Sequence, residues 1–223
     1  MATPEVGSAV INGKGSVRPL VICGPSGVGK GTLIARLMAA HPSAFALSVS
    51  HTTRGPRPGE VNGVHYHFTD RESMASRIAA GEFLESAHVH GNMYGTSYSS
   101  VRAVTDMGRC CVLDIDVQGV ETVRPHLEAL YVFVMPPRVE ALEARLKKRN
   151  TEDEESLRKR IANARTEMEK SKSPGLFDHV VVNDDLDECF DELSALVFHP
   201  SAGVGLLADT SAAPAAAAAA AAM

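Results

Sequence analysis

Tryptophan is absent from the 223-residue sequence, and only 5 % of its residues are aromatic. A hydrophobic core built from this chain is therefore expected to be mainly aliphatic. An excess of positive charge is also missing, because the formal net charge is −5 at pH 7. General nucleic-acid binders neutralise many phosphates with lysine and arginine, so this balance argues against nucleic acid as a partner. A small anionic ligand held by a few local cations stays compatible with it.

Long hydrophobic runs are lacking as well. The sequence has no run of about 18 apolar residues, the length that a membrane-spanning helix needs, so we expect no membrane partner. Residues 1–15 lack the basic start and the apolar block of a signal peptide. The chain has only four cysteines, none of them in a C-x-x-C pair. These absences predict a cytoplasmic protein without disulfides.

Short apolar runs alternate with helical patterns along most of the chain. The runs that predict strands lie at 19–23, 45–50, 110–116, 130–134 and 179–183. This alternation predicts an α/β fold of three layers, in which helices cover both faces of a parallel sheet. Residues 49–99 break the alternation, because the stretch at 83–97 has the pattern of a hairpin. An inserted, β-rich lobe is therefore expected there.

The two ends of the chain differ in composition from the rest. Residues 1–17 contain glycine and serine without periodicity, which predicts a loose arm. Residues 199–223 end in a run of alanines that is too short for a stable isolated helix, so a disordered tail is expected. The predicted folded domain spans residues 18–198.

A glycine-rich loop directly follows the first predicted strand. Residues 24–30, GPSGVGK, satisfy the G-x-x-x-x-G-K pattern of a phosphate-binding loop, and a helical run comes next. Glycines let backbone N–H groups turn toward phosphate oxygens, and the lysine reaches the same oxygens as a point charge. The predicted site comprises Gly24, Pro25, Ser26, Gly27, Val28, Gly29, Lys30, Gly31 and Thr32. The alternative is a glycine-rich turn that binds nothing.

Gly31 departs from the usual pattern, in which serine or threonine follows the lysine. The hydroxyl group that would face a metal ion is therefore missing from its usual place. Mg²⁺ keeps much of its water, so we expect phosphate oxygens and water to hold it near Asp116, without a direct protein ligand.

Residues 51–68, HTTRGPRPGEVNGVHYHF, place two arginines three positions apart in a bent, non-helical stretch. The guanidinium forks of Arg54 and Arg57 match a phosphate group. The hydroxyl groups of Tyr66 and Tyr94 would complete such a cradle. Taken alone, the segment is also compatible with a solvated basic loop beside packed tyrosines.

Several segments in fixed order resemble the guanylate kinase family. After GPSGVGKGT they are SVSHTTRGPRPGEVNGVHYHF, FLESAHVHGNMYGTS, LDIDVQGV and VNDDLD, and the resemblance covers residues 18–198. The R-x-x-R-x-G-E-x-x-G-x-x-Y block is highly specific, whereas the phosphate loop alone is not. The resemblance implies a P-loop core (18–48, 100–142 and 166–198), a GMP-binding lobe (49–99) and a small helical lid (143–165).

The resemblance also implies an activity and its residues: Mg²⁺-dependent, direct in-line phosphorylation of GMP by ATP to give GDP, with dGMP open as a second acceptor. The residues that it implies for catalysis are Lys30, Arg54, Arg149 and Arg160. Those that it implies for ATP, besides the phosphate loop, are Arg145 and Asn183. Those that it implies for GMP are Ser50, Arg54, Arg57, Tyr66, Glu85, Tyr94, Gly95, Thr96, Asp114 and Asp116.

The chemistry of guanine agrees with the assignment of Glu85. Guanine presents N1–H and N2–H₂ side by side, and a carboxylate accepts both, whereas adenine has no donor at N1. Structural alternatives stay open: Glu85 as a surface acid, Asp114 and Asp116 as strand-end acids bonded to backbone donors, and Arg145 as a salt-bridged helix residue. Two other functions also stay open, a non-catalytic guanylate-kinase-like binding module and a kinase for another nucleoside monophosphate. Both a monomer and a dimer fit the sequence.

Overall fold

The computed structural model describes residues 17–89, 91–148 and 154–199. The predicted arm and tail therefore lie almost entirely outside the described residues. Arg149 also lies outside them. Among the helices of the described part, none combines the length and the apolar character that a membrane crossing requires.

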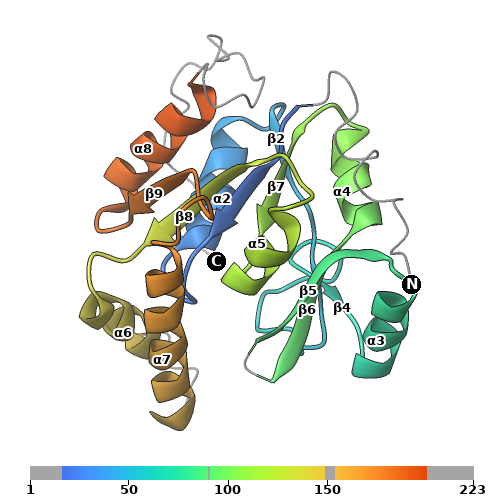
Figure 1. The fold of residues 1–223 in the computed structure, drawn as a ribbon, viewed down its shortest axis with the longest axis horizontal. Coiled ribbons are helices and arrows are strands. Elements are labelled where there is room, and N and C mark those ends of the chain that lie inside the picture. The colour runs from blue at the N-terminus through green and yellow to red at the C-terminus, as the bar shows by residue number, and fades with distance from the viewer. Residues whose placement is uncertain (1–16, 90, 149–153, 200–223) are drawn as a thin grey trace.

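Five strands form a parallel sheet at the centre of the fold (Figure 1). They are β1 (Leu20–Cys23), β2 (Phe45–Leu47), β7 (Cys110–Asp114), β8 (Leu130–Met135) and β9 (His179–Val182), in the order β2-β7-β1-β8-β9. Every neighbouring pair is parallel. The three central strands β7, β1 and β8 are buried almost throughout, and strands buried on both faces have continuous apolar sequences, which is why the sequence predicted the centre of this sheet correctly.

Two strands end two or more residues before their predicted ends. β2 ends at Leu47 rather than at residue 50. Ser48 adds one more hydrogen bond to the ladder, from its N–H to the Val112 carbonyl at 2.9 Å, and the chain then crosses to a second sheet. β7 ends at Asp114, two residues before the predicted end, because Asp116 is already the N-cap of the next helix.

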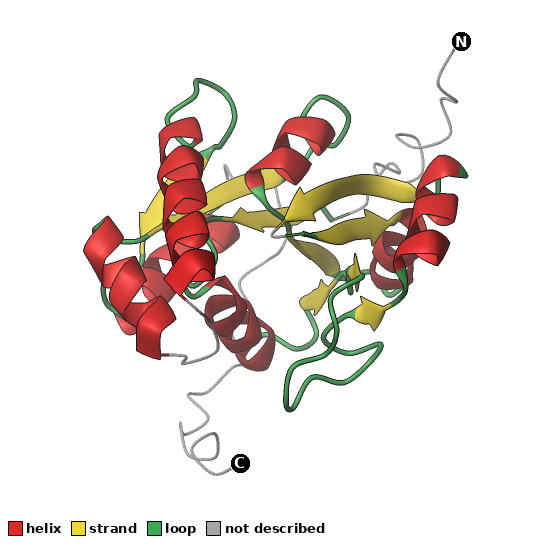
Figure 2. Cartoon of the chain, turned by 90° about the horizontal axis from the view of Figure 1, so that it is seen from below, coloured by secondary structure: helices red, strands yellow, loops and turns green. Residues whose placement is uncertain are grey.

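Helices cover both faces of the parallel sheet (Figure 2). The helices that share one core cluster are α2 (Lys30–Ala40), α6 (Val139–Lys148), α7 (Glu154–Lys170) and α8 (Leu186–Phe198). Those that share the other cluster are α4 (Tyr98–Thr105) and α5 (Val117–Val123). Leu20 and Ile22 of β1 enter the first cluster, and Val21 and Cys23 enter the second. Successive residues of one strand thus fill opposite cores, which confirms the three-layer prediction.

A second, mixed sheet lies between β2 and α4 in the chain. Its strands are β3 (His51–Thr52), β4 (His67–Phe68), β5 (Phe83–Val89) and β6 (Asn92–Ser97), in the order β4-β3-β6-β5. β3 and β4 are parallel, whereas β6 is antiparallel to both β3 and β5. α3 (Arg71–Ala79) connects β4 to β5. The predicted hairpin and the predicted β-rich insertion are confirmed.

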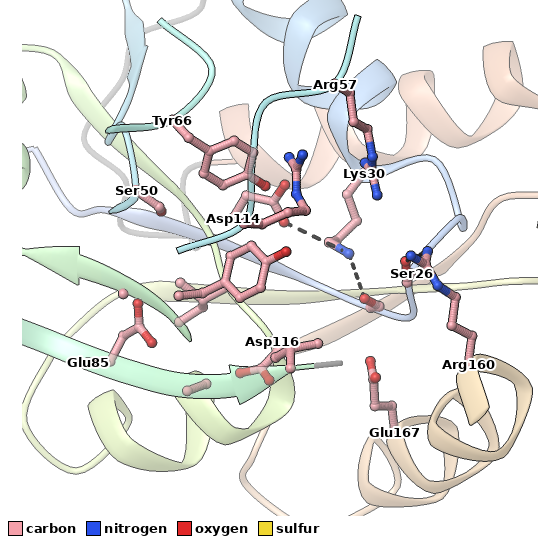
Figure 3. Close-up of a pocket in the computed structure, with 17 residues that line it drawn as sticks. Ser26, Lys30, Ser50, Arg57, Tyr66, Glu85, Asp114, Asp116, Arg160 and Glu167 are labelled. Carbon is pink, nitrogen blue, oxygen red and sulfur yellow. Dashed lines mark hydrogen bonds and ion pairs between the residues drawn. The ribbon is translucent and has the colours of Figure 1, made fainter. Parts of the chain in front are cut away.

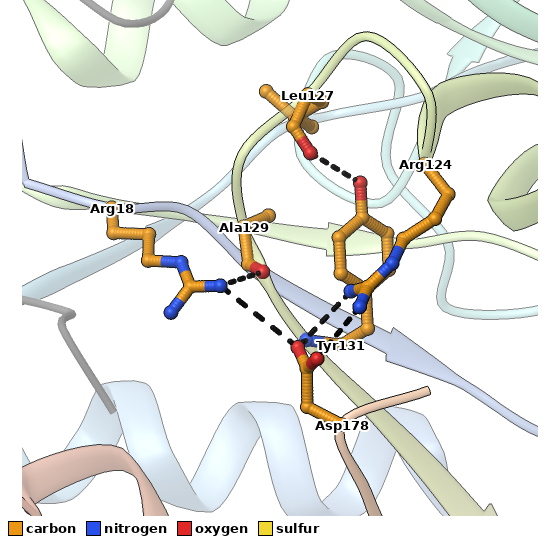
Figure 4. Close-up of polar contacts among 6 residues, drawn as sticks. All are labelled: Arg18, Arg124, Leu127, Ala129, Tyr131 and Asp178. Atoms are coloured by element: carbon orange, nitrogen blue, oxygen red, sulfur yellow. Dashed lines mark hydrogen bonds and ion pairs between the residues drawn. The ribbon is translucent and has the colours of Figure 1, made fainter. Parts of the chain in front are cut away.

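A polar network links several segments of the chain near the N-terminal ends of β1 and β8, at the end of the sheet opposite the glycine-rich loop (Figure 4). The Asp178 carboxylate accepts hydrogen bonds from both terminal nitrogens of Arg124, at 3.1 and 2.7 Å, and from the Tyr131 amide at 2.9 Å. Arg18 donates to the Ala129 carbonyl at 2.7 Å. Burial raises the pKa of Asp178, but Arg124 and the Tyr131 amide outweigh burial and hold this pKa below its ordinary value.

Candidate active site

The glycine-rich loop turns tightly between β1 and α2. Gly24 has a φ of +144° and Gly29 a φ of +109°, which both lie in the region that favours glycine. A Cβ on Gly24 would collide with the Val134 carbonyl oxygen, and a Cβ on Gly29 would lie 2.5 Å from Asn183 Nδ2. In the described part of the chain, no side chain caps the N-terminus of α2. A helix start of this kind suits an anion, because its first N–H groups have no partner within the helix.

Lys30 opens α2 and folds back over the loop. Its Nζ donates a 2.6 Å hydrogen bond to the Gly24 carbonyl and lies 3.9 Å from Asp114 Oδ1. Asp114 ends β7, the neighbour of β1, so the carboxyl ends of two adjacent parallel strands meet here. Open α/β sheets bind their ligands at this kind of place. Burial raises the pKa of Asp114, and Lys30 opposes this effect only in part.

One cavity joins the loop to the second sheet (Figure 3). The predicted site residues that line it are Gly24, Ser26, Lys30, Ser50, Arg54, Arg57, Tyr66, Glu85, Tyr94, Gly95, Asp114, Asp116 and Arg160. They come from the loop, from both sheets and from α7, so the fold gathers residues that lie far apart in the sequence.

Arg54 is held in place by its neighbours. Its two terminal nitrogens donate to Glu60 Oε1 at 2.9 Å and to the Gly55 carbonyl at 2.6 Å. The other oxygen of Glu60 accepts the Arg57 backbone N–H at 2.7 Å, so one carboxylate fixes the turn and the guanidinium together. Burial raises the pKa of Glu60, but the Arg57 amide and Arg54 outweigh it, so the pKa is lowered and the carboxylate stays ionised.

Two tyrosines lie beside Arg54. The rings of Tyr66 and Tyr94 meet edge to face with their centroids 6.0 Å apart, and the Arg54 guanidinium lies 5.4 Å from the centroid of Tyr66. Burial, with Asp114 nearby, raises the pKa of Tyr66 to about 12. The Tyr66 hydroxyl therefore stays protonated and is able to donate a hydrogen bond to an anion.

Glu85 is a buried carboxyl group on β5. It is only 5 % exposed and lies opposite the fully buried Thr96 of β6. Thr96 is not among the residues that line the cavity, but its hydroxyl group lies 3.4 Å from that of Ser50, which does line it. Burial raises the pKa of Glu85 to about 7; the Thr96 hydrogen bond opposes this shift, and Asp116 adds to it. The alternative interpretation of Glu85 as a surface acid is wrong.

Asp116 has a structural contact besides its place in the cavity. It is the N-cap of α5, and its Oδ1 accepts the Gly119 N–H at 2.8 Å. The structural alternative therefore holds for Asp116, which has a backbone donor, whereas Asp114 faces Lys30. A Cβ on Gly119 would lie 3.0 Å from Glu85 Oε2, so α5 forms the wall behind Glu85.

Two predicted arginines lie on different sides of the loop. Arg160 of α7 donates to Ser26 Oγ at 3.0 Å and lines the cavity. Arg145 of α6 instead donates to the carbonyls of Asn183 at 2.9 Å and Asp184 at 3.2 Å. Among the described residues Arg145 has no ion pair, so its interpretation as a salt-bridged helix residue is wrong.

Arg145 belongs to a second hollow, apart from the main cavity. Its lining comprises Gly27, Val28, Gly29, Thr32, Arg145, Lys148, Asn183, Asp184 and Leu186. Asn183 is 4 % exposed and donates from Nδ2 to the Val28 carbonyl at 2.7 Å, which ties β9 to the loop. The glycine-rich loop therefore lies between the main cavity, on the side of the second sheet, and the second hollow, on the side of α6 and α8.

Three residues of this region carry no prediction from the sequence. Glu60 lies within the arginine block, where its fixed spacing from Arg54 and Arg57 is a usable signal. Gly119 lies in LDIDVQGV, but only the packing of α5 on Glu85 gives it significance. Glu167 lines the cavity from α7, although in the sequence it is one of many charges on a helix.

A parallel sheet whose first strand leads through a glycine loop into a helix, with a cavity over the strand ends, defines a P-loop α/β protein. A family model described as guanylate kinase matches residues 16–200. The chain belongs to the guanylate kinase family.

Known relatives agree with this assignment. The chain is 59 % identical over 181 residues to "Guanylate kinase 1" of Oryza sativa subsp. japonica and 55 % identical over 177 residues to "Guanylate kinase" of Sus scrofa. The match covers 81 % of this chain and 47 % of the rice protein, so the chain spans about half the length of that relative. For the pig protein it covers 79 % of this chain and 89 % of the relative.

A solved structure supports the fold. Guanylate kinase from Anaplasma phagocytophilum is 31 % identical in sequence and has a TM-score of 0.63 to this chain. The match covers 82 % of this chain and 85 % of that one.

Proposed function

We propose that this chain transfers the terminal phosphoryl group of ATP to GMP, producing ADP and GDP. One observation carries the proposal: a single cavity extends from Lys30 and the glycine loop to the buried Glu85, with Arg54 and Arg57 in its lining. The loop suits the phosphates of a donor nucleotide, the arginines suit the phosphate of an acceptor, and the carboxyl group suits guanine. The names of the relatives point to the same reaction.

The acceptor's phosphate would bind to Arg54, Arg57, Tyr66 and Tyr94. Arg54 donates in part to the neutral Gly55 carbonyl, and phosphate oxygens are stronger acceptors for a guanidinium. Glu60 keeps the guanidinium in place during this exchange, because it also holds the backbone at Arg57.

The base would be selected by Glu85, with Ser50 and Thr96 offering hydroxyl donors to guanine O6 and Gly95 and Asp116 completing the pocket. The ionised carboxylate accepts from both N1–H and N2–H₂ of guanine. Adenine would leave this buried carboxylate without a donor, which costs about 1–3 kcal/mol or more for a charged group. Among the described residues that line the cavity, none stands out as a ligand for the ribose hydroxyl groups, so we expect dGMP to be a second acceptor.

The donor's phosphates would lie in the glycine loop, where Lys30 and the N-terminus of α2 are available. Its nucleoside would occupy the second hollow, beside Arg145, Asn183 and Thr32. This arrangement puts the two nucleotides on opposite sides of the loop and leaves their phosphates facing each other. Direct in-line transfer needs such an approach and no covalent intermediate.

The oxygen groups of this site suit Mg²⁺ that is bound through water molecules. Asp114, which lies 3.9 Å from Lys30, and Asp116 offer carboxylate oxygens in the same cavity, while the position after Lys30 is Gly31, which has no hydroxyl group. Within the described ranges, no three histidine, cysteine or acidic side chains gather in a way that would hold a metal ion directly. We therefore expect phosphate oxygens and water to complete its coordination. The bound ion would neutralise charge on the transferred phosphoryl group.

Arg160 and Arg149 would stabilise the negative charge that develops during transfer, since phosphoryl transfer depends mainly on positioning and electrostatics. We assign residues 143–165 to a lid that carries these arginines, residues 49–99 to the GMP-binding lobe and the remainder of 18–198 to the core. We place the reaction in purine nucleotide metabolism in the cytoplasm.

A coupled assay of ADP release with GMP, AMP, UMP and CMP tests the proposal. GMP should be the strongly preferred acceptor, and Lys30→Ala should lower kcat by at least about 100-fold while calorimetry still detects GMP binding. Preferred turnover of AMP, UMP or CMP would indicate a kinase for another nucleotide. GMP binding without ADP release from the wild type would indicate a binding module.

A further inference from the structure

Gly119 lies where the core helix α5 meets the second sheet. It is buried, and its N–H donates to Asp116 Oδ1 at 2.8 Å. On its other side a Cβ would lie 3.0 Å from Glu85 Oε2, 3.4 Å from Glu85 Cδ and 3.2 Å from Ile115 Cβ. The backbone of this one residue therefore contacts both Glu85 and Asp116.

The backbone conformation does not explain a glycine at this position. Gly119 is the third residue of α5 and lacks the positive φ found at Gly24 and Gly29. Glycine is a poor helix former, so alanine would be favoured here by helix propensity alone. Space is what disfavours a side chain, since a Cβ 3.0 Å from the Glu85 carboxylate oxygen requires that oxygen or the helix to shift by a few tenths of an ångström.

The backbone of Glu85 has little room to move aside. Glu85 is 5 % exposed, and a Cβ on Gly95 would lie 2.9 Å from its carbonyl oxygen, so the adjacent strand packs closely on this backbone. The Glu85 carboxylate lines the cavity, so a Cβ at position 119 would turn the carboxylate toward the cavity. Moving α5 instead would carry Asp116 with it, because Asp116 caps the helix through Gly119. Either movement changes the position of Glu85 relative to Asp116.

We infer, on the basis of the proposed function, that Gly119 is a positioning residue for guanine recognition. Its missing side chain lets α5 lie against Glu85 and fixes the orientation of that carboxylate. N1–H and N2–H₂ of guanine donate in the plane of the base, so both carboxylate oxygens must lie in that plane to accept them together. A carboxylate rotated by a neighbouring methyl group accepts only one of these donors. The core domain thus helps to set the base specificity of the inserted lobe.

Gly119→Ala tests this inference, with Thr122→Ala as the control because Thr122 is exposed on the same helix. Gly119→Ala should raise the KM for GMP by about tenfold to a hundredfold, the loss expected for one hydrogen bond to a charged group. The kcat and the KM for ATP should change little. The melting temperature should change little, since the helix propensity that alanine gains offsets the cost of its close contact with Glu85, and this separates positioning from a merely structural role. Thr122→Ala should leave the KM for GMP unchanged.

A double variant shows whether Gly119 acts through Glu85. Glu85→Asp withdraws the carboxylate from position 119, so its effect and that of Gly119→Ala should not multiply in Gly119→Ala/Glu85→Asp. A wild-type KM for GMP in Gly119→Ala, or effects that multiply in the double variant, would overturn the inference. Calorimetry with GMP in the absence of ATP keeps the two proposals apart. GMP binding that Gly119→Ala weakens supports the role of Gly119 even if the wild type releases no ADP, a result that would refute only the proposed reaction.

Discussion

Replacing Asp178 with alanine should destabilise the protein by about 2–4 kcal/mol. Tyr131 is 0 % exposed in the intact protein, and its amide N–H would lose its only side-chain acceptor among the described residues. An unsatisfied buried donor costs about 1–3 kcal/mol. The bidentate contact with Arg124 joins side chains that are 28 % and 25 % exposed, and after solvent screening its loss adds about 1 kcal/mol.

Urea unfolding of the full chain measures this effect, as a lower midpoint with an unchanged m-value. Glu169→Ala is the matched control, because Glu169 pairs with Lys172 at 2.7 Å while both side chains are at least 67 % exposed. That variant should lose no more than about 0.5 kcal/mol. If Asp178→Ala were no less stable than Glu169→Ala, the network would not hold the strand ends together.

Acid provides an independent check on the same contact. The pKa of Asp178 is lowered in the folded protein, so the contact contributes fully at pH values above the ordinary Asp pKa of about 3.9. Its contribution is lost as the pH falls through the lowered value. The stability difference between the wild type and Asp178→Ala should therefore be constant near neutrality and shrink in acid. A difference that grows with acidification would contradict the sign of this argument.

Two further predictions concern the proposed site. Burial raises the pKa of Glu85 to about 7, and only its ionised form accepts both guanine donors, so the KM for GMP should rise about tenfold for each pH unit below 7. A flat profile between about pH 5.5 and 8.5 would remove Glu85 from the base pocket. Gly31→Ser should fold normally, since a Cβ there meets nothing within 4 Å, and its hydroxyl should lower the Mg²⁺ concentration for half-maximal rate by about threefold. An unchanged Mg²⁺ requirement would show that position 31 does not face the metal ion.

The parallel sheet and the phosphate loop were predictable because their signals are local. A strand buried on both faces is apolar throughout, and the loop glycines encode a turn that Lys30 completes within seven residues. Glu85 is a different case, since nothing in its own segment separates it from a surface acid. Its burial results from Thr96 on one side and Gly119 on the other, and only the resemblance to a family pointed to it.

The partners of the lid and loop side chains were not predictable, because tertiary packing sets them. In the sequence, Arg145 and Arg160 look alike on neighbouring helices. In the structure, Arg160 bonds to Ser26 in the main cavity, whereas Arg145 bonds to backbone carbonyls in the second hollow. Asp116 likewise joins a cavity position with the N-cap of α5, a combination that no local pattern reports.

The net charge of −5 says little about what the cavity binds, because the positions of the charged side chains in the cavity matter more than the total charge of the chain. The cavity lining has four cations, Lys30, Arg54, Arg57 and Arg160, and four acids, Glu85, Asp114, Asp116 and Glu167. Three of these cations donate partly to neutral oxygens: Lys30 to the Gly24 carbonyl, Arg54 to the Gly55 carbonyl and Arg160 to the Ser26 hydroxyl.

Phosphate oxygens are charged and therefore stronger acceptors than these neutral groups, so nucleotide binding would replace weak contacts with strong ones. The acids would not oppose this exchange, provided that each has a donor or a cation to face. Asp116 has the N–H of Gly119, Asp114 has Lys30, and Glu85 would have guanine. Burial raises the pKa of Glu167, and the charge of Lys30 opposes this effect. Under the proposed function, a slightly acidic chain would in this way accept two polyanions, because its cavity would separate the groups that recognise the base from the groups that hold the phosphates.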